Sequence, residues 1–120
     1  MQPANYDLSI YHGDSGHWRF TLTQQDGTPC DLDCVVAKSQ IRDKPGGTAL
    51  LVTMDCTITL PNVIDVILTP ENSFKLTPKG GAWDLQLTYP SGEIKTPVAG
   101  AVAVTEDVTD STPYVGNHRG

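Results

Sequence analysis

Apolar and polar residues alternate over most of this chain, in short runs that end at glycine, proline, asparagine or aspartate. The run Trp83-Asp84-Leu85-Gln86-Leu87-Thr88-Tyr89 is the clearest, and Pro90-Ser91-Gly92 follows it at once. Another alternating run covers residues 18–23 and ends close to the turn signal Asp26-Gly27. A period of two places alternate side chains on opposite faces of a strand, so these runs predict half-buried β-strands.

The same pattern predicts strands over residues 6–11, 16–23, 35–42, 48–54, 58–60, 64–68, 83–89 and 94–105. One short helical turn is expected near residues 70–77, with Thr69 as its cap and Pro70 at its first position. About seven or eight strands with turn signals at regular spacing indicate an all-β antiparallel sandwich. The alternation selects the following core anchors: Trp18, Phe20, Ile41, Trp83, Leu85, Leu87 and Val102.

Chain length restricts the number of domains, and charge restricts the classes of partner. The chain has 120 residues, which fits one domain, expected over residues 6–108 between an N-terminal arm of residues 1–5 and a C-terminal arm of residues 109–120. Its net charge of −6 and its eight lysines and arginines argue against nucleic acid or an anionic membrane as a partner. The sequence shows no signal peptide and no membrane span.

The segment Gly13-Asp14-Ser15-Gly16, followed by His17, matches the surroundings of the nucleophilic serine in trypsin-like proteases. It also matches a block near the N-terminus of one esterase family. Neither context is present, because Ser15 precedes almost everything that a triad needs and the helices of the esterase fold are missing. A polar turn between two strands is the favoured interpretation, and no enzymatic activity is expected.

The spacing of the cysteines and of three aspartates is compared with that of known metal sites. Cys30, Cys34 and Cys56 could together approach a zinc shell, but no Cys-x-x-Cys pair exists, and Cys34 is expected to be a small core residue. Three aspartates could hold calcium weakly, yet the pattern of a calcium loop is absent; they are Asp26, Asp31 and Asp33. No metal and no cofactor are expected. The odd number of cysteines favours synthesis in a reducing cytoplasm over a disulfide-stapled secreted domain.

Several segments in their order resemble the small immunoglobulin-like modules of tailed-bacteriophage structural proteins, which include minor tail proteins and baseplate or fibre-attachment domains. The resemblance covers roughly residues 6–109. The segments are Gly13-Asp14, Arg19-Phe20-Thr21-Leu22, Asp26-Gly27-Thr28-Pro29, Gln40-Ile41-Arg42, Trp83-Asp84-Leu85-Gln86-Leu87, Pro90-Ser91-Gly92, Gly100-x-Val102-x-Val104 and Asp107-Val108-Thr109. It implies an immunoglobulin-like sandwich, a place in the virion, other virion proteins as partners in multiple copies, and no catalytic residues.

The expected function is therefore that of a tail or baseplate adaptor, or a fibre-attachment module, which acts through protein–protein contacts. Two alternatives stay open: a capsid decoration protein, and a module that binds a carbohydrate or a receptor. Candidate contact residues are Tyr6, Tyr11, Tyr114 and Val115. For the carbohydrate alternative, Tyr89 joins the three other tyrosines as a group on which a sugar could stack.

Overall fold

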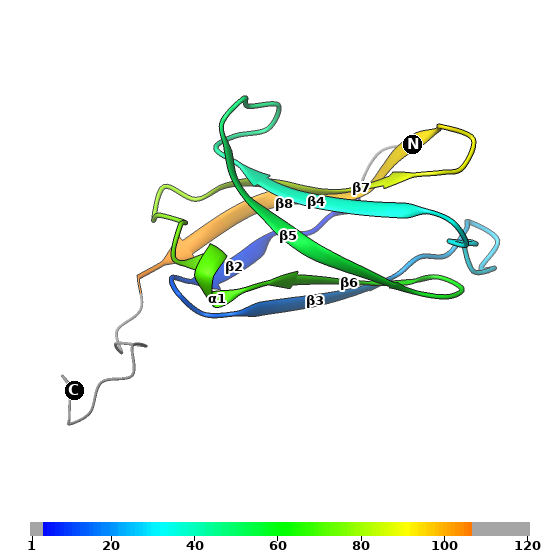
Figure 1. Ribbon diagram of the computed structural model, residues 1–120, viewed down its shortest axis with the longest axis horizontal. Coiled ribbons are helices and arrows are strands. Elements are labelled where there is room, and N and C mark those ends of the chain that lie inside the picture. The colour runs from blue at the N-terminus through cyan, green and yellow to red at the C-terminus, as the bar shows by residue number, and fades with distance from the viewer. Residues whose placement is uncertain (1–3, 107–120) are drawn as a thin grey trace, which may run out of the picture.

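Eight strands and one short helix form two packed layers in the computed structural model, which describes residues 4–106 (Figure 1). The predicted all-β sandwich is thereby confirmed. The elements are β1 Ala4–Asn5, β2 Leu8–Tyr11, β3 Gly16–Thr21, β4 Val36–Arg42, β5 Leu50–Thr59, β6 Val63–Leu68, α1 Pro70–Ser73, β7 Gly81–Thr88 and β8 Ile94–Thr105.

Strand β5 joins the two layers. Its first half pairs with β4 as far as Met54, and its second half pairs with β6 from Asp55 onward, so the strand passes from one sheet to the other (Figure 1). The large sheet therefore contains β1, β2, β8, β7, β4 and the first half of β5, and the small sheet contains the second half of β5 with β6 and β3. The two strands predicted over 48–54 and 58–60 are one, because no turn residue interrupts the alternation between them.

The N-terminal segment lies along β8 in two pieces. β1 and β2 both pair with β8 in parallel, and Tyr6 and Asp7 interrupt the single strand that was predicted over 6–11. The interruption has a local cause, since the Asp7 carboxylate accepts a hydrogen bond from the Ala101 backbone N–H at 2.9 Å. Ala4 and Asn5, assigned to an N-terminal arm from the sequence, belong to β1.

The pairing pattern is that of an immunoglobulin-like sandwich. β3, β6 and the second half of β5 correspond to strands B, E and D of that fold, and β4, β7 and β8 correspond to C, F and G. The first half of β5 extends the second group as strand C′ does in variable-type domains. The N-terminal strands lie on the β8 side and leave β3 at the other end of the strand order.

The core fills the space between the sheets. The predicted anchors Ile41, Trp83, Leu85, Leu87 and Val102 are all buried there, together with three residues of β6, namely Ile64, Val66 and Leu68. The other two predicted anchors, Trp18 and Phe20, pack against this core but are only half-buried.

Trp83 connects both layers with the N-terminal segment. Its ring is buried and lies against the Phe20 ring of the small sheet, with 5.7 Å between the ring centroids. Its indole N–H donates a hydrogen bond to the Tyr6 carbonyl oxygen at 2.7 Å. Gly100, which pairs with Trp83, permits this approach, because a Cβ at that position would overlap the Tyr6 carbonyl.

Helix α1 closes one end of the sandwich. The Thr69 hydroxyl accepts a hydrogen bond from the Asn72 N–H, so the predicted cap is confirmed, although the helix is shorter than the predicted range 70–77. The Ser73 hydroxyl is buried and joins the helix to the turn before β3. It accepts a hydrogen bond from the Gly13 N–H and donates one to the Tyr11 carbonyl.

Replacing Trp83 tests its role. We expect Trp83→Ala to lower the free energy of unfolding by about 3–5 kcal/mol, because it removes a buried aromatic ring. Trp83→Phe should cost less, about 1–3 kcal/mol, since it keeps a ring but leaves the Tyr6 carbonyl without its donor. Urea unfolding followed by circular dichroism measures both values. A loss below about 1 kcal/mol for Trp83→Ala would place this ring outside the core.

Candidate interaction surface

Strand β3 has one unpaired edge. It pairs with β6 along its whole length, and no other strand within residues 4–106 pairs with it. The Leu22 N–H donates to the Asn62 carbonyl, which continues the β6 ladder, so even-numbered residues direct their backbone groups to β6. His17, Arg19 and Thr21 therefore direct their N–H and C=O groups to the open edge. Such an edge can accept a further strand.

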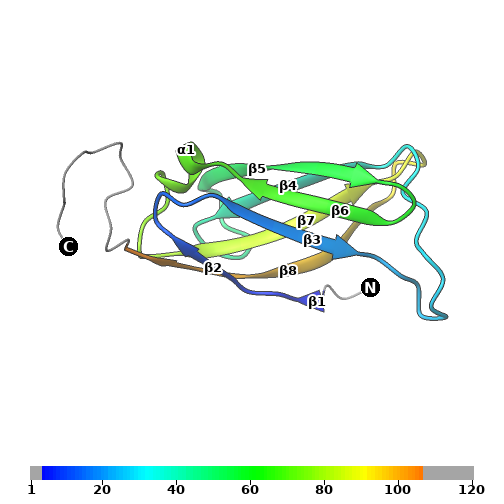
Figure 2. The ribbon, with the colours of Figure 1, turned by 90° about the horizontal axis from the view of Figure 1, so that it is seen from below.

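The sandwich is also incompletely filled along this edge. The side chains of Trp18, Phe20 and Leu22 point inward but stay half-exposed. The inward side chains of the neighbouring strand β6 are fully buried, with relative exposures of 0% for Ile64, Val66 and Leu68. The difference arises because β3 is the last strand of the small sheet and the N-terminal strands lie across the opening on β8 (Figure 2).

A cleft of about 430 Å³ lies in this opening. Phe20 and Leu22 of the small sheet line one side, while Leu87 and Pro97 line the other. Two tyrosines stand at its margin. The Tyr6 ring meets the Phe20 ring edge-on with the centroids 5.3 Å apart, and the Lys95 ammonium lies 5.5 Å above the centre of the Tyr89 ring. Unpaired backbone and an apolar cleft thus lie next to each other.

Asp65 organises the outer face of the small sheet beside this edge. Its carboxylate accepts hydrogen bonds from the Arg19 Nε–H at 2.8 Å and from the His17 ring at 2.7 Å. The hydrogen bond from Arg19, followed by the one from His17, holds the pKa of Asp65 below its usual value. The sequence places Asp65 on a polar strand face but gives no sign of its partners, which come from β3, more than forty residues earlier.

The candidate contact residues fall in different places. Tyr6 is 46% exposed and lines the cleft, whereas Tyr11 is 57% exposed at the end of β2 and does not line it. Tyr114 and Val115 lie outside the described residues. Leu22 and Pro97 were not selected from the sequence as contact residues. The only available signal was that Leu22 continues the alternation of β3 beyond Phe20.

The Gly13–Gly16 segment forms the predicted turn between β2 and β3, closed by a hydrogen bond from the Asp14 N–H to the Tyr11 carbonyl. The neighbouring histidines are engaged elsewhere: the His17 ring contacts Asp65, and the His12 ring lies within hydrogen-bonding distance of the Phe74 carbonyl. Over residues 4–106, Ser15 forms no hydrogen bond with a histidine.

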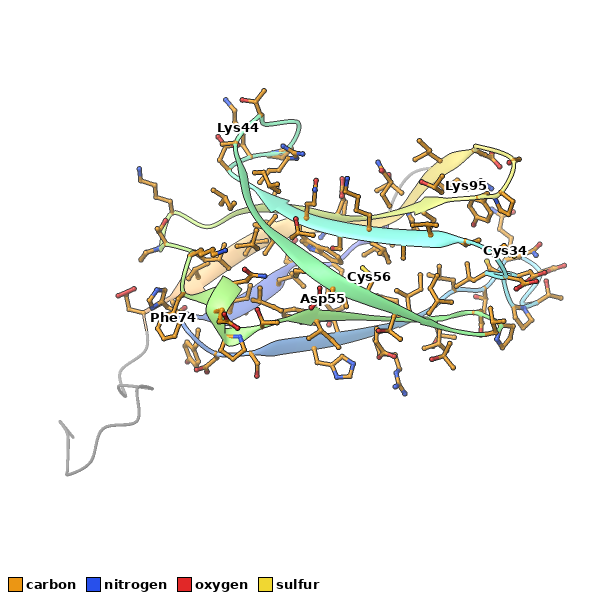
Figure 3. The ribbon with its side chains drawn as sticks, in the orientation of Figure 1. Cys34, Lys44, Asp55, Cys56, Phe74 and Lys95 are labelled. Atoms are coloured by element: carbon orange, nitrogen blue, oxygen red, sulfur yellow. The ribbon has the colours of Figure 1, made fainter. Side chains whose placement is uncertain are left out.

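The prediction that Cys34 is a small core residue is wrong. Cys34 is exposed, with a φ of 63°, in the turn that precedes β4 (Figure 3). The Val35 N–H closes this turn on the Leu32 carbonyl, and Leu32 occupies the core in place of the cysteine. Cys30 and Cys56 are half-buried.

Within residues 4–106 no three histidine, cysteine or acidic side chains gather closely enough to hold a metal ion. The acidic loop before β4 uses its carboxylates locally. Asp26 accepts hydrogen bonds from the backbone and hydroxyl of Thr28, and Asp31 accepts one from the Asp33 N–H. In the same range no helix is long and apolar enough to cross a membrane.

No protein-family model matches this chain, and no curated protein matches its sequence. Among solved structures, it is similar to the ZIG-8–RIG-5 IG1–IG1 heterodimer in its monoclinic crystal form. The TM-score is 0.47 and the sequences are 9% identical, over 87% of this chain and 85% of that one.

The Asp65 cluster predicts an acid-sensitive contribution to stability. Since the pKa of Asp65 is lower in the folded state than in the unfolded chain, its contribution is complete above the unfolded value of about 3.9 and disappears as the pH falls through the folded value. We expect wild type to be more stable than Asp65→Asn at pH 7, with a gap that narrows steadily below about pH 4. Urea unfolding of both proteins from pH 7 to pH 2 measures the gap, and a gap that is constant with pH would contradict this assignment.

The cysteines should differ in reactivity. Burial, and then the nearby Asp55 carboxylate, raise the pKa of Cys56 to about 11, whereas Cys34 is exposed (Figure 3). The thiolate is the reactive form, so we expect Cys34 to react first with a disulfide reagent such as DTNB and Cys56 to react much more slowly until the protein is unfolded. Cys34→Ser should remove the fast phase. Equal rates for all three thiols in the native protein would contradict the placement of Cys56.

Proposed function

We propose that this chain is a non-enzymatic structural module of a phage virion, a tail or baseplate adaptor that joins other virion proteins through the open edge of β3. The observation that carries the proposal is the unpaired edge over Gly16–Thr21 beside the apolar cleft. The virion setting comes from the resemblance of the sequence segments to phage tail modules.

Strand addition is the mode of binding that this edge supports. A partner strand laid along β3 would bond to the outward N–H and C=O groups of His17, Arg19 and Thr21, and these backbone bonds would supply affinity. Every second side chain of that strand would face inward, toward the half-exposed rings of Trp18 and Phe20. Apolar residues at these positions of the partner would complete the core and supply specificity.

A virion is a suitable setting for such an edge. A single added strand of about six residues buries a modest area, so one contact alone would be weak. Symmetric particles present many copies of each protein, and multivalent attachment turns weak contacts into a stable assembly. A capsid decoration protein would use the same edge in the same way, and the position of the chain in the particle separates the two roles.

The test uses particles of the phage that encodes the chain. We expect mass spectrometry to detect the protein in purified particles, and a virion reconstruction to place its density in the tail or baseplate. Thr21→Pro removes one outward N–H that the domain does not use, and should lower incorporation at least tenfold. Tyr89→Ala alters the cleft and should also lower incorporation. Tyr11→Ala changes an exposed tyrosine outside the cleft and serves as the matched control, which should be incorporated normally.

Purified variants must first show the thermal midpoint of wild type within a few degrees. Absence of the protein from particles would overturn the virion role. Incorporation of Thr21→Pro and Tyr89→Ala at the level of Tyr11→Ala would overturn the role of the β3 edge. An esterase or protease activity that Ser15→Ala abolishes would overturn the non-enzymatic assignment.

A further inference from the structure

A second hollow lies on the outer face of the large sheet and shares only Asn5 with the lining of the cleft. Its volume is about 720 Å³, and β4, β7, β8 and the N-terminal segment form its walls and floor. The loop between β4 and β5 contributes Lys44, Pro45 and Gly46 to one rim and rises above the sheet (Figures 1 and 3). Of the residues selected from the sequence as contacts, those within residues 4–106, Tyr6 and Tyr11, do not line this hollow.

The hollow exists because neighbouring strands carry side chains of very different length. Along one row of the sheet, Arg42 of β4 lies beside Ala82 of β7, which lies beside Ala101 of β8. The adjacent row contains Gln40, Asp84 and Ala99 in the same order. Long polar side chains therefore stand on β4, and alanine side chains leave the surface low on β8. A main chain could approach this floor closely.

Three cations lie on the β4 side of the hollow, while the two carboxylates of its lining, Asp7 and Asp84, lie on the N-terminal segment and on β7. Lys38, Arg42 and Lys44 line the hollow and are three of the eight lysines and arginines in a chain of net charge −6. The salt bridges within residues 4–106 belong to Asp65, so none of these three cations has a carboxylate in direct contact in that range. Burial raises the pKa of Asp84, and the Arg42 charge acts on this carboxyl and partly opposes the rise. Arg42 is oriented by Gln40, whose side-chain oxygen accepts a hydrogen bond from the guanidinium at 3.0 Å.

Polar groups on the floor and the near wall add hydrogen-bonding capacity. Asp84 is half-buried at the middle of the floor, and its carboxylate accepts no hydrogen bond from another residue in the range 4–106. Gln40 lies beside it on β4, and Gln86 follows it two residues later on β7. Carboxylate and amide oxygens at these positions can accept hydrogen bonds from backbone N–H groups, and the amide N–H groups can donate to backbone carbonyls.

We propose that this hollow binds an acidic, extended peptide segment of a partner protein, whose side-chain carboxylates meet Lys38, Arg42 and Lys44 while its backbone bonds to Asp84 and the flanking glutamines. Charge complementarity selects the acidic side chains, and the alanine floor admits the main chain. An acidic sugar is the weaker match, because the only aromatic residue that lines the hollow within residues 4–106, Trp83, is 3% exposed and offers no ring for stacking. The site is separate from the β3 edge and does not depend on the proposed role of that edge.

The test titrates the full ¹⁵N-labelled chain with an amidated penta-glutamate peptide, with penta-glutamine as the neutral probe. We expect the amide signals of Ala82, Ala99 and Ala101 to shift with penta-glutamate and not with penta-glutamine. The double variant Lys38→Gln/Lys44→Gln should weaken binding at least tenfold. The matched control Lys75→Gln/Lys79→Gln removes the same charge from exposed positions outside the hollow and should change the affinity less than twofold.

A second pair of variants separates shape from charge. Ala101→Phe fills the floor and leaves all three cations in place, so it should abolish binding. Ala103→Phe places the same ring two residues further along the exposed face of β8, outside the hollow, and should bind as wild type does. Thermal midpoints confirm that each variant is folded.

Several results would overturn the proposal. These are no shift of the three alanine signals, equal weakening by the two lysine pairs, unchanged binding by Ala101→Phe, and tighter binding of an acidic uronate oligosaccharide than of penta-glutamate. Equal weakening by the two lysine pairs, or unchanged binding by Ala101→Phe, would reduce the effect to general charge attraction. Tighter binding of the uronate oligosaccharide would assign the hollow to a sugar.

Discussion

The indole of Trp83 brings together three parts of the chain that the sequence keeps far apart. Its ring faces Phe20 of the small sheet, and its N–H bonds to the Tyr6 carbonyl, so one side chain spans the sandwich and fixes the N-terminal segment against β8. A buried indole N–H needs a hydrogen-bond acceptor, and the backbone carbonyls of the neighbouring strands in the large sheet already accept hydrogen bonds from the strands that pair with them. The break between β1 and β2 supplies a free carbonyl, and Gly100 leaves room for it.

This arrangement explains why the domain is open at β3. The N-terminal strands are committed to β8 by their parallel pairing and by the Trp83 bond, and therefore do not cover the edge of the small sheet. The inward side chains of β3 meet the core from one side only and remain half-exposed. Phe20 belongs to both environments, since it stacks on Trp83 and lines the cleft. Core packing and the candidate binding edge thus share one aromatic ring.

Alternation along the chain was sufficient to predict the strands and most of the core, because burial of one face is a local property of a strand. It was not sufficient for features that depend on pairing. Trp18 and Leu85 follow the same pattern, yet one lies on an edge strand and stays half-exposed while the other is central and fully buried. Likewise Cys34 directly precedes the alternating run of β4, but it belongs to a turn and is exposed. The hollow could not be predicted from the sequence either, because it depends on the strand order β4-β7-β8. That order places Ala101 two strands away from Arg42.

Strand β7 couples the two candidate surfaces through its pleat. Trp83 points inward toward the cleft side of the core, while its neighbours Ala82 and Asp84 point outward into the hollow. A shift of β7 by one residue would exchange these faces and destroy both features together. The pairing of Trp83 with Gly100 opposes such a shift, because only that register places the indole N–H on the Tyr6 carbonyl. The residue that anchors the core therefore also sets the register on which the hollow depends.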